Sequence, residues 1–441
     1  MQIQDINRLL SEGRLDEPGL FPHLEALASL GVTFRQSFGL DHLPEGPGLL
    51  IIRGARQYGK STWLEGELKK TIQTFGPGSA LYLNGDDLKD EEDLLRHIED
   101  LVPVFASNRQ VKRLFIDEIT AVGAWEKAFK RAADRGLLRQ ILVVSTGSRA
   151  ADLRRGAERL PGRKGRLART QYLFTPLPYW EFSAKAKDRF AEKTVLAYLL
   201  SGGCPIACHD MIMEGRLSED VISMVRDWIF GECYASGRDR ASLLSVFDIL
   251  IKTAGNPVGQ TSLAREAGLA NNTVAAGYIG LLSDLMVALP CLAWDSSRNS
   301  VIRRKPGKFH FINLLAAVAW HPAHLRSPED FERLAREEQA KFWEWLVAQE
   351  LWRRSASAGQ EFPDGLRYWA AGGHEIDFVT PEKDLIEVKR GSASPLDFLW
   401  FPKSFPKKRL TLVNEKSFET SALRGLTMEE FLLDPGLSVG R

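Results

Sequence analysis

The stretch from residue 49 to residue 62 has the residue types and the spacing of a phosphate-binding loop. A short apolar run ends at Gly54, and a loop then leads to Gly59, Lys60 and Ser61 at the start of a plausible helix. This is the pattern G-x-x-x-x-G-K-[ST] between a strand and a helix, which is the context that a P-loop requires. Glycines allow successive backbone N–H groups to converge on phosphate oxygens, and the helix adds its positive N-terminal end. The sequence therefore predicts a nucleotide-binding site.

The predicted contacts to the nucleotide lie in this loop and at the start of the helix. We expect Lys60 to reach the β- and γ-phosphates of ATP and Ser61 to hold Mg²⁺. The residues predicted to bind the cofactor here are Gly54, Ala55, Arg56, Gln57, Tyr58, Gly59, Lys60, Ser61 and Thr62.

Two further apolar runs end in polar residues. Residues 113–118 end in Asp117 and Glu118, as in a Walker B strand that delivers acids to the edge of a sheet beside the phosphates. We expect Asp117 to hold Mg²⁺ through water and Glu118 to orient or deprotonate the attacking water. Residues 140–148 end in small polar side chains, and Ser148 is predicted to contact the γ-phosphate or the water.

The elements that position these residues alternate between strand and helix, which predicts an α/β fold with a doubly wound parallel sheet and the nucleotide at its carboxyl edge. Farther along, we expect a helix around residues 243–251, a second over 261–267 that ends at Gly268 and a third from Asn271 to Leu285. Two apolar runs around a basic segment follow within residues 287–311, and this order is typical of a winged helix. The predicted domains are residues 1–48, an N-terminal helical extension; 49–183, the P-loop core; 184–235, a helical lid; 236–310, a winged helix; and 311–441, a separate α/β unit.

The composition is that of an ordinary globular protein, with 44% hydrophobic and 26% charged residues among 441. No apolar run approaches the roughly 18 residues that a membrane span needs, and the N-terminus lacks a signal pattern. Four cysteines are too few for a disulfide framework, so we expect a reducing, cytoplasmic location and no membrane. The spacing Cys204-x-x-x-Cys208-His209 lacks a second ligand pair, which favours small buried cysteines over zinc.

Basic residues gather in three places although the net charge is only +1. The clusters lie within residues 149–169, 296–310 and 403–409, and they favour a polyanion such as DNA as partner. Each cluster alone is also consistent with solvated surface. The helix expected to enter the major groove begins at Asn271 and carries no arginine, so a winged helix that only packs between domains is an alternative.

Motifs in a characteristic order then identify a resemblance. They are residues 54–61, 115–118 with Trp125, 146–148, Gly162-Arg163, 176–182 and 202–205. In these the chain resembles the bacterial and archaeal AAA-like P-loop ATPases that carry a C-terminal restriction-endonuclease-like domain, over nearly all of its length beyond residue 48. The resemblance makes Arg163 the first candidate for an arginine that reaches a phosphate, from its own subunit or a neighbour in a homo-oligomer. Arg149, Arg154 and Arg155 are competing candidates, as is a plain basic surface.

The C-terminal unit resembles the PD-(D/E)xK nuclease fold through Asp377 and the pair Glu387-x-Lys389, with residues 373–377 fitting the strand motif of that fold. The resemblance implies that Asp377 and Glu387 bind Mg²⁺ or Mn²⁺ and that Lys389 supplies positive charge. Glu344, on the preceding helix, aligns with the acid that completes the metal site, and Glu350 is the alternative. The same fold also serves as an inactive binding module, so both interpretations stand.

Three functions follow from these predictions. The first is a Mg²⁺-dependent ATPase coupled to nucleic-acid binding, with metal-dependent DNA cleavage by the C-terminal domain. The second is an ATP-driven switch that binds DNA or a protein partner and cuts nothing. The third is a scaffold that holds nucleotide without turnover.

Overall fold

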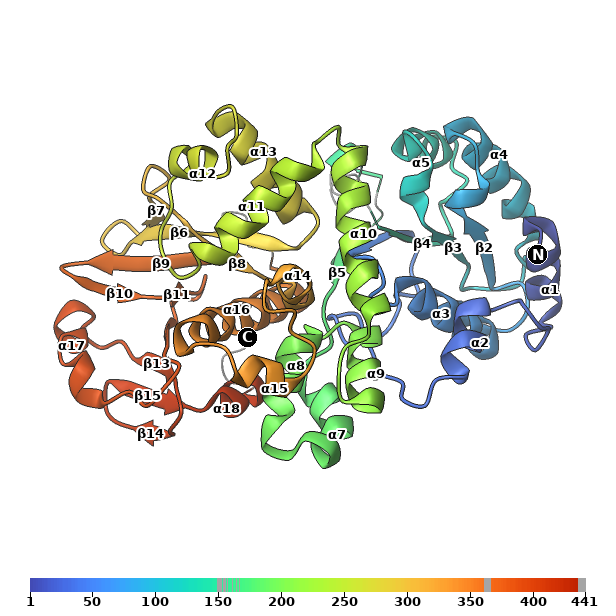
Figure 1. Ribbon diagram of the computed structural model, residues 1–441. Helices are drawn as coiled ribbons and strands as arrows, with labels where there is room; N and C mark the ends of the chain where they lie inside the picture. The colour runs from blue at the N-terminus through green and yellow to red at the C-terminus, as the bar shows by residue number, and fades with distance from the viewer. Residues whose placement is uncertain are drawn as a thin grey trace. The chain divides into compact units, whose positions relative to one another are not determined.

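The computed structural model describes residues 1–148, 153, 156, 158–160, 162–163, 165, 167–360 and 366–434. The chain divides into two compact units, residues 1–175 and 176–441 (Figure 1). The predicted P-loop core extended to residue 183, whereas the structure places residues 176–183 in the second unit. Among the helices of the described residues, none combines the length and the apolar character that crossing a bilayer requires.

The first unit is built on a parallel sheet with the strand order β2-β3-β4-β1-β5. Because these strands are parallel, their carboxyl ends meet at one edge. The strands are β1 (Gly48–Gly54), β2 (Ala80–Asn84), β3 (Arg113–Asp117), β4 (Leu142–Gly147) and β5 (Gln171–Phe174). The helices are α1 (Ile3–Glu12), α2 (Pro22–Ala28), α3 (Lys60–Phe75), α4 (Glu91–Leu101) and α5 (Trp125–Asp134).

Both faces of this sheet are covered by helices. Leu49 and Ile51 of β1 belong to a buried cluster with Ile98 of α4 and Phe129 of α5. The alternate residues of β1, such as Leu50, are equally buried but lie outside this cluster, because successive side chains of a strand point to opposite faces. Helix α3 contacts β2, β3 and β4 on that other face (Figure 1). The expected doubly wound arrangement therefore fits the first unit.

The N-terminal helices pack on the sheet and on α3. Helix α1 lies against the edge strand β2, where the side-chain amide of Asn7 donates to the carbonyl of Tyr82 at 2.7 Å and accepts from its N–H at 2.8 Å. This side chain therefore satisfies backbone groups that an edge strand would otherwise expose. Helix α2 contacts α3.

The second unit begins with a run of helices and continues into two sheets. The helices before the first strand are α7 (Tyr179–Phe190), α8 (Thr194–Ser201), α9 (Pro205–Glu214), α10 (Glu219–Ala235), α11 (Arg240–Lys252), α12 (Gln260–Glu266) and α13 (Asn272–Asp284). The later helices are α14 (Leu314–Trp320), α15 (Pro328–Glu332), α16 (Arg336–Ser357), α17 (Phe401–Ser404) and α18 (Met428–Leu433).

One of these sheets crosses the border predicted between residues 310 and 311. It has the order β10-β9-β6-β7, with β8 also paired to β6, and β6 pairs with β9 in parallel. The predicted winged-helix segment and the C-terminal unit therefore share a sheet, which a local reading of the sequence did not anticipate. Its strands are β6 (Ala288–Asp295), β7 (Ser300–Val301), β8 (Lys308–Phe311), β9 (Leu366–Ala371) and β10 (His374–Ile376).

The other sheet has the order β11-β12-β13-β15-β14. Its strands are β11 (Phe378–Val379), β12 (Leu385–Val388), β13 (Leu410–Val413), β14 (Phe418–Glu419) and β15 (Leu423–Leu426). Residues 373–377 fit the strand motif of the nuclease fold, but the structure ends β10 at Ile376 and begins β11 at Phe378, with Asp377 between them. That residue therefore joins β10 of one sheet to β11 of the other.

Candidate functional site

The predicted P-loop connects β1 to α3 at the carboxyl edge of the first sheet. Gln57 and Gly59 have φ angles of +62° and +91°, so the loop turns through the left-handed region before α3 begins at Lys60. Ser61 and Thr62 lie in the first turn of α3, where backbone N–H groups have no partner inside the helix. This geometry suits an anion with several oxygens, such as a polyphosphate.

Lys60 is buried within this loop and only 5% exposed. Its ammonium group donates to the carbonyl of Gly54 at 3.0 Å and to that of Ala55 at 2.8 Å. Burial lowers the pKa of Lys60, and the nearby acids Glu118 and Asp117 oppose that shift. The lysine is thus held by its own loop, and a phosphate would take the place of these carbonyls.

The two acids of the predicted Walker B strand are fixed by the end of the neighbouring strand β4. The hydroxyl of Thr146 donates to Oδ1 of Asp117. The backbone N–H of Ser148 donates to Oε2 of Glu118 at 3.0 Å. Glu118 itself has a φ of +44°, which is unusual for a residue with a side chain and sets its carboxylate against the end of β4. The strands β1, β4 and β3 are adjacent, so Lys60 and both acids lie at one edge.

Two contacts that support this candidate site were not predicted from the sequence. Thr146 was noted only as part of a polar strand end, although its hydroxyl contacts the predicted Mg²⁺ ligand. Gln36, in the N-terminal segment, donates from Nε2 to the carbonyl of Tyr58 at 3.2 Å and so braces the P-loop. The contact of Thr146 could have been predicted from the sequence, because a hydroxyl at the end of a strand beside the Walker B strand faces the acid. No local sequence pattern predicts the contact of Gln36.

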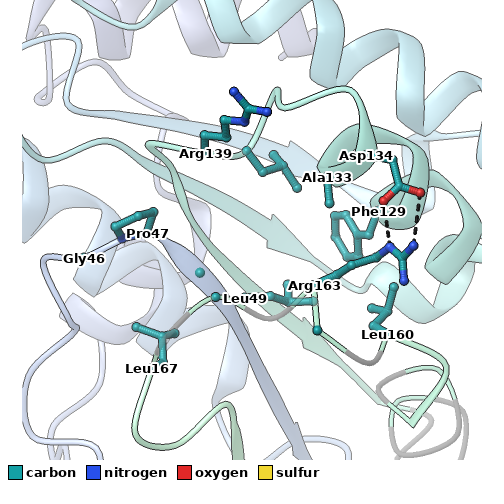
Figure 2. Close-up of a pocket in the computed structure, with 14 residues that line it drawn as sticks. Gly46, Pro47, Leu49, Phe129, Ala133, Asp134, Arg139, Leu160, Arg163 and Leu167 are labelled. Atoms are coloured by element: carbon teal, nitrogen blue, oxygen red, sulfur yellow. Dashed lines mark hydrogen bonds and ion pairs between the residues drawn. The ribbon is translucent and has the colours of Figure 1, made fainter.

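The structure does not bring Arg163 to the phosphate side of its own chain. Arg163 forms an ion pair with Asp134, with Nε and Oδ1 2.8 Å apart (Figure 2). Both line a pocket of about 530 Å³ with Gly46–Leu49, at the start of β1. The P-loop follows the other end of this strand, so the expectation that Arg163 reaches a phosphate of its own subunit does not fit this geometry. Arg149, Arg154 and Arg155 lie outside the described residues.

In the second unit, the predicted nuclease residues come from three elements. Glu344 lies on α16, Asp377 at the break between β10 and β11, and Glu387 on β12. The N–H of Asp377 donates to Oε2 of Glu387 at 3.2 Å, and the N–H of Val388 donates to Oδ2 of Asp377 at 3.0 Å. Lys389 pairs with Oε1 of Glu387 at 2.5 Å. Glu375 lies nearby, and we call the acids Glu344, Glu375, Asp377 and Glu387 the C-terminal carboxylate cluster.

Burial and mutual repulsion dominate the electrostatics of this cluster. Burial, followed by the charge of Asp377, raises the pKa of Glu344 to about 8 and that of Glu387 to about 8. Carboxyl groups with such values take up protons near neutral pH unless a cation joins them. Within the described ranges, no group of three or more His, Cys, Asp or Glu side chains is arranged to hold a metal ion. The predicted ligands Glu344, Asp377 and Glu387 therefore interact but do not form a ligand set in this structure.

Glu350, the alternative to Glu344 as the helical acid of the predicted metal site, has a different role. Its carboxylate is buried and pairs with Arg353 at 2.7 Å and with Arg354 at 2.5 Å. These two arginines hold the pKa of Glu350 below its ordinary value despite burial. Glu350 therefore stabilises α16.

Comparison with known proteins identifies the first site. Residues 47–183 match the family model described as an AAA domain. This segment therefore resembles an AAA-family P-loop ATPase domain. The chain is also 26% identical over 212 residues to the uncharacterized protein MJ1544 of Methanocaldococcus jannaschii, covering 46% of this chain and 44% of that protein. The chain thus matches less than half the length of this relative.

Comparison with solved structures gives matches of low TM-score, three of which follow. One is a variant of Thermotoga maritima RuvB, with 17% identity and a TM-score of 0.30, covering 58% of this chain and 85% of that one. Another is the Aeropyrum pernix ORC1 protein in complex with DNA, with 14% identity and a TM-score of 0.31, covering 72% and 91%. A third is the Walker-type ATPase PABY2304 of Pyrococcus abyssi, with 11% identity and a TM-score of 0.40, covering 72% and 95%.

Proposed function

We propose that the chain is a Mg²⁺-dependent ATPase whose nucleotide state controls nucleic-acid binding by the second unit. The observation that carries the first part is that Lys60, Asp117 and Glu118 lie at one sheet edge, with the end of β4 holding both acids. In this proposal Lys60 contacts the β- and γ-phosphates, Ser61 and Asp117 hold Mg²⁺, and Glu118 orients the attacking water. Ser148 fixes Glu118 through its backbone.

The helices α11, α12 and α13 with the strands β6, β7 and β8 support a winged helix as the nucleic-acid-binding part. Asn271 caps α13, accepting from the N–H of Val274 at 3.0 Å. The exposed basic side chains of Arg298, Arg304 and Lys305 lie between β6 and β8, where they suit a DNA backbone. Replacing both Arg304 and Lys305 with alanine should weaken DNA binding and reduce the slope of log K against log[salt] by about 2.

The arrangement of Arg163 favours action between subunits over action within one. An arginine at the start of β1 can reach a phosphate only in a neighbouring copy, so the proposal includes a homo-oligomer assembled through the AAA domain. The described cysteines are free and buried, which suits a reducing cytoplasmic location. Sedimentation with ATP, for wild type and Arg163→Ala, tests the assembly.

A trapping variant tests the ATPase. Glu118→Gln should bind ATP and hydrolyse it slowly, so that ATP remains on the protein after gel filtration, while Lys60→Ala should bind none. A scaffold without turnover predicts instead that Glu118→Gln behaves as wild type.

Two functions remain for the C-terminal domain, metal-dependent DNA cleavage and nucleic-acid binding without cleavage. The side-chain contacts of Asp377 and Glu387 support the second. Both Asp377 and Glu387 pair with lysines, and the described residues hold no ready metal set. Purified protein should therefore be tested on plasmid and linear DNA with Mg²⁺ or Mn²⁺, with and without ATP. Cleavage that is lost in Glu387→Ala would establish a nuclease. DNA-stimulated ATP hydrolysis without cleavage would establish a DNA-bound switch.

A further inference from the structure

Lys308 is a buried cation at the C-terminal carboxylate cluster. The sequence places it in a basic run that was predicted to be surface, yet its side chain is 1% exposed. Its ammonium group donates to Oδ1 of Asp377 at 3.1 Å and to Oε1 of Glu375. An ammonium group is removed from water at high cost unless acids pair with it. The ion pairs with these two carboxylates therefore stabilise the buried ammonium group of Lys308.

Lys308 reaches the cluster from a part of the chain that was predicted to be another domain. It lies on β8, whose partner β6 also pairs with β9, the strand that precedes β10 and Asp377. Its ammonium group also lies 5.6 Å from the centre of the Tyr368 ring on β9. The lysine is thus enclosed by the sheet that the two segments share.

The cluster still contains more acid than its two lysines neutralise. Among the described residues, the cations that pair with these four acids or act on them are Lys308 and Lys389, so two negative charges remain uncompensated when all four acids are ionised. In addition, Oε2 of Glu344 is buried and has no hydrogen-bond partner among the described residues. A divalent cation would supply both missing charges and a partner for this oxygen.

We propose that Lys308 is an internal cation that holds the C-terminal carboxylate cluster in a closed, metal-free form, and that a divalent metal binds there only in competition with it. Oxygen ligands lie about 2.0–2.6 Å from Mg²⁺ or Ca²⁺. An ammonium group on Oδ1 of Asp377 would therefore stand directly beside the metal and repel it. The inference rests on the proposed function for the identity of the ligand, a divalent metal, but it does not require that DNA is cut.

The test is calorimetric titration of the full chain with Mn²⁺ in the absence of nucleotide. The variants are Lys308→Met and Lys308→Gln, which remove the charge, and Lys308→Arg, which retains it. Lys252→Met, at an exposed position in the last turn of α11, is the control for the loss of one positive charge. We expect both neutral variants to bind Mn²⁺ about tenfold more tightly or better, and the other two to match wild type. The gain should disappear when Asp377→Asn is added.

Thermal unfolding gives a second readout that is independent of activity. The neutral variants should be less stable than wild type in EDTA and should regain more stability from Mn²⁺, since a ligand that binds only the folded state stabilises it. Lys308→Gln retains a hydrogen-bond donor and is the variant more easily accommodated.

Equal or weaker Mn²⁺ binding by folded neutral variants would overturn the inference. So would failure of both to fold even with Mn²⁺, because the metal could not then replace the lysine. Tighter Mn²⁺ binding without DNA cleavage would support the role of Lys308 and contradict only the nuclease part of the proposed function.

Discussion

The hydroxyl group of Thr146 donates a hydrogen bond to Oδ1 of Asp117 and so joins the ends of the neighbouring strands β4 and β3. The N–H of Glu118 lies 3.1 Å from the same carboxylate oxygen and 3.4 Å from the threonine hydroxyl. These bonds set the direction of the carboxylate that we propose as a Mg²⁺ ligand. On that proposal, the strand that lies between the P-loop strand and the Walker B strand would take part in positioning the metal.

Replacing Thr146 tests this role. Thr146→Val keeps the branched shape but removes the donor, so Asp117 loses one of its fixed partners. Hydrogen bonds to charged groups contribute about 1.5–3 kcal/mol, and we expect kcat for ATP hydrolysis to fall about tenfold or more. Thr146→Ser retains the hydroxyl and should retain most of the activity. Unchanged hydrolysis in Thr146→Val would mean that Asp117 is held without it.

Lys60 gives a prediction about binding. In this structure its ammonium group is bound by the carbonyls of Gly54 and Ala55, so binding of ATP exchanges these for phosphate oxygens. Lys60→Met should lower the affinity for ATP about 100-fold, because charge-assisted bonds to phosphate are lost. Lys70→Met, at an exposed position of the same helix, removes an equal charge and should bind ATP as wild type. Equilibrium titration with a fluorescent ATP analogue measures both.

The nucleotide site could be predicted because its signals are local. The P-loop, the Walker B acids and β4 each combine an apolar run with the polar residues that end it, and the order of the runs implies the parallel sheet. Whether an arginine lies at the same edge is not a local property. Arg163 follows β4 in the chain but pairs with Asp134, on the side where β1 begins. Sequence motifs make Arg163 a candidate for contact with a phosphate, but they do not predict at which edge of the sheet it lies.

Lys308 shows the same limit more clearly. In the sequence it is one of five basic residues without a neighbouring acid, which is typical of exposed surface. Its partner Asp377 comes 69 positions later, and the two meet only because β6 pairs with both β8 and β9. A pairing between strands so far apart leaves no trace in local charge or hydrophobic periodicity. For this reason the border predicted between residues 310 and 311 separates segments whose strands pair in one sheet.

Gly54 gives a prediction about stability. A Cβ atom at this position would lie 2.7 Å from Cβ of Phe174 and 2.8 Å from its carbonyl oxygen on β5. Gly54→Ala should therefore force β1 and β5 apart and lower the free energy of unfolding by about 1–3 kcal/mol. Gly66→Ala is the matched control, because nothing lies within 4 Å of a Cβ there and alanine favours the interior of α3. Urea unfolding should show a loss for the first variant and none for the second.

The last prediction concerns pH and the contact between α2 and α3. Nδ1 of His23 lies 2.6 Å from Oε1 of Glu65, while Oε2 accepts the N–H groups of His23 and Leu24, each at 3.0 Å. The hydrogen bond to Glu65 raises the pKa of His23 above its ordinary value near 6.5, although partial burial opposes the shift. The proton is therefore bound more tightly in the folded state. The resulting stabilisation is complete below about pH 6.5 and is lost as the pH rises through the raised value.

His23→Gln should accordingly lower the free energy of unfolding more at about pH 6 than at about pH 9. Because half of the His23 side chain is exposed, we expect this difference to stay below about 1 kcal/mol. Urea unfolding at the two pH values measures it, with His42→Gln as the control at an exposed histidine of the same unit. An effect of His23→Gln that is equal at both pH values would show that the neutral imidazole binds Glu65 as well as the charged one does. In that case the contact of α2 with α3 would not depend on the charge of His23, and the two backbone N–H groups that Glu65 accepts would act alongside a neutral imidazole.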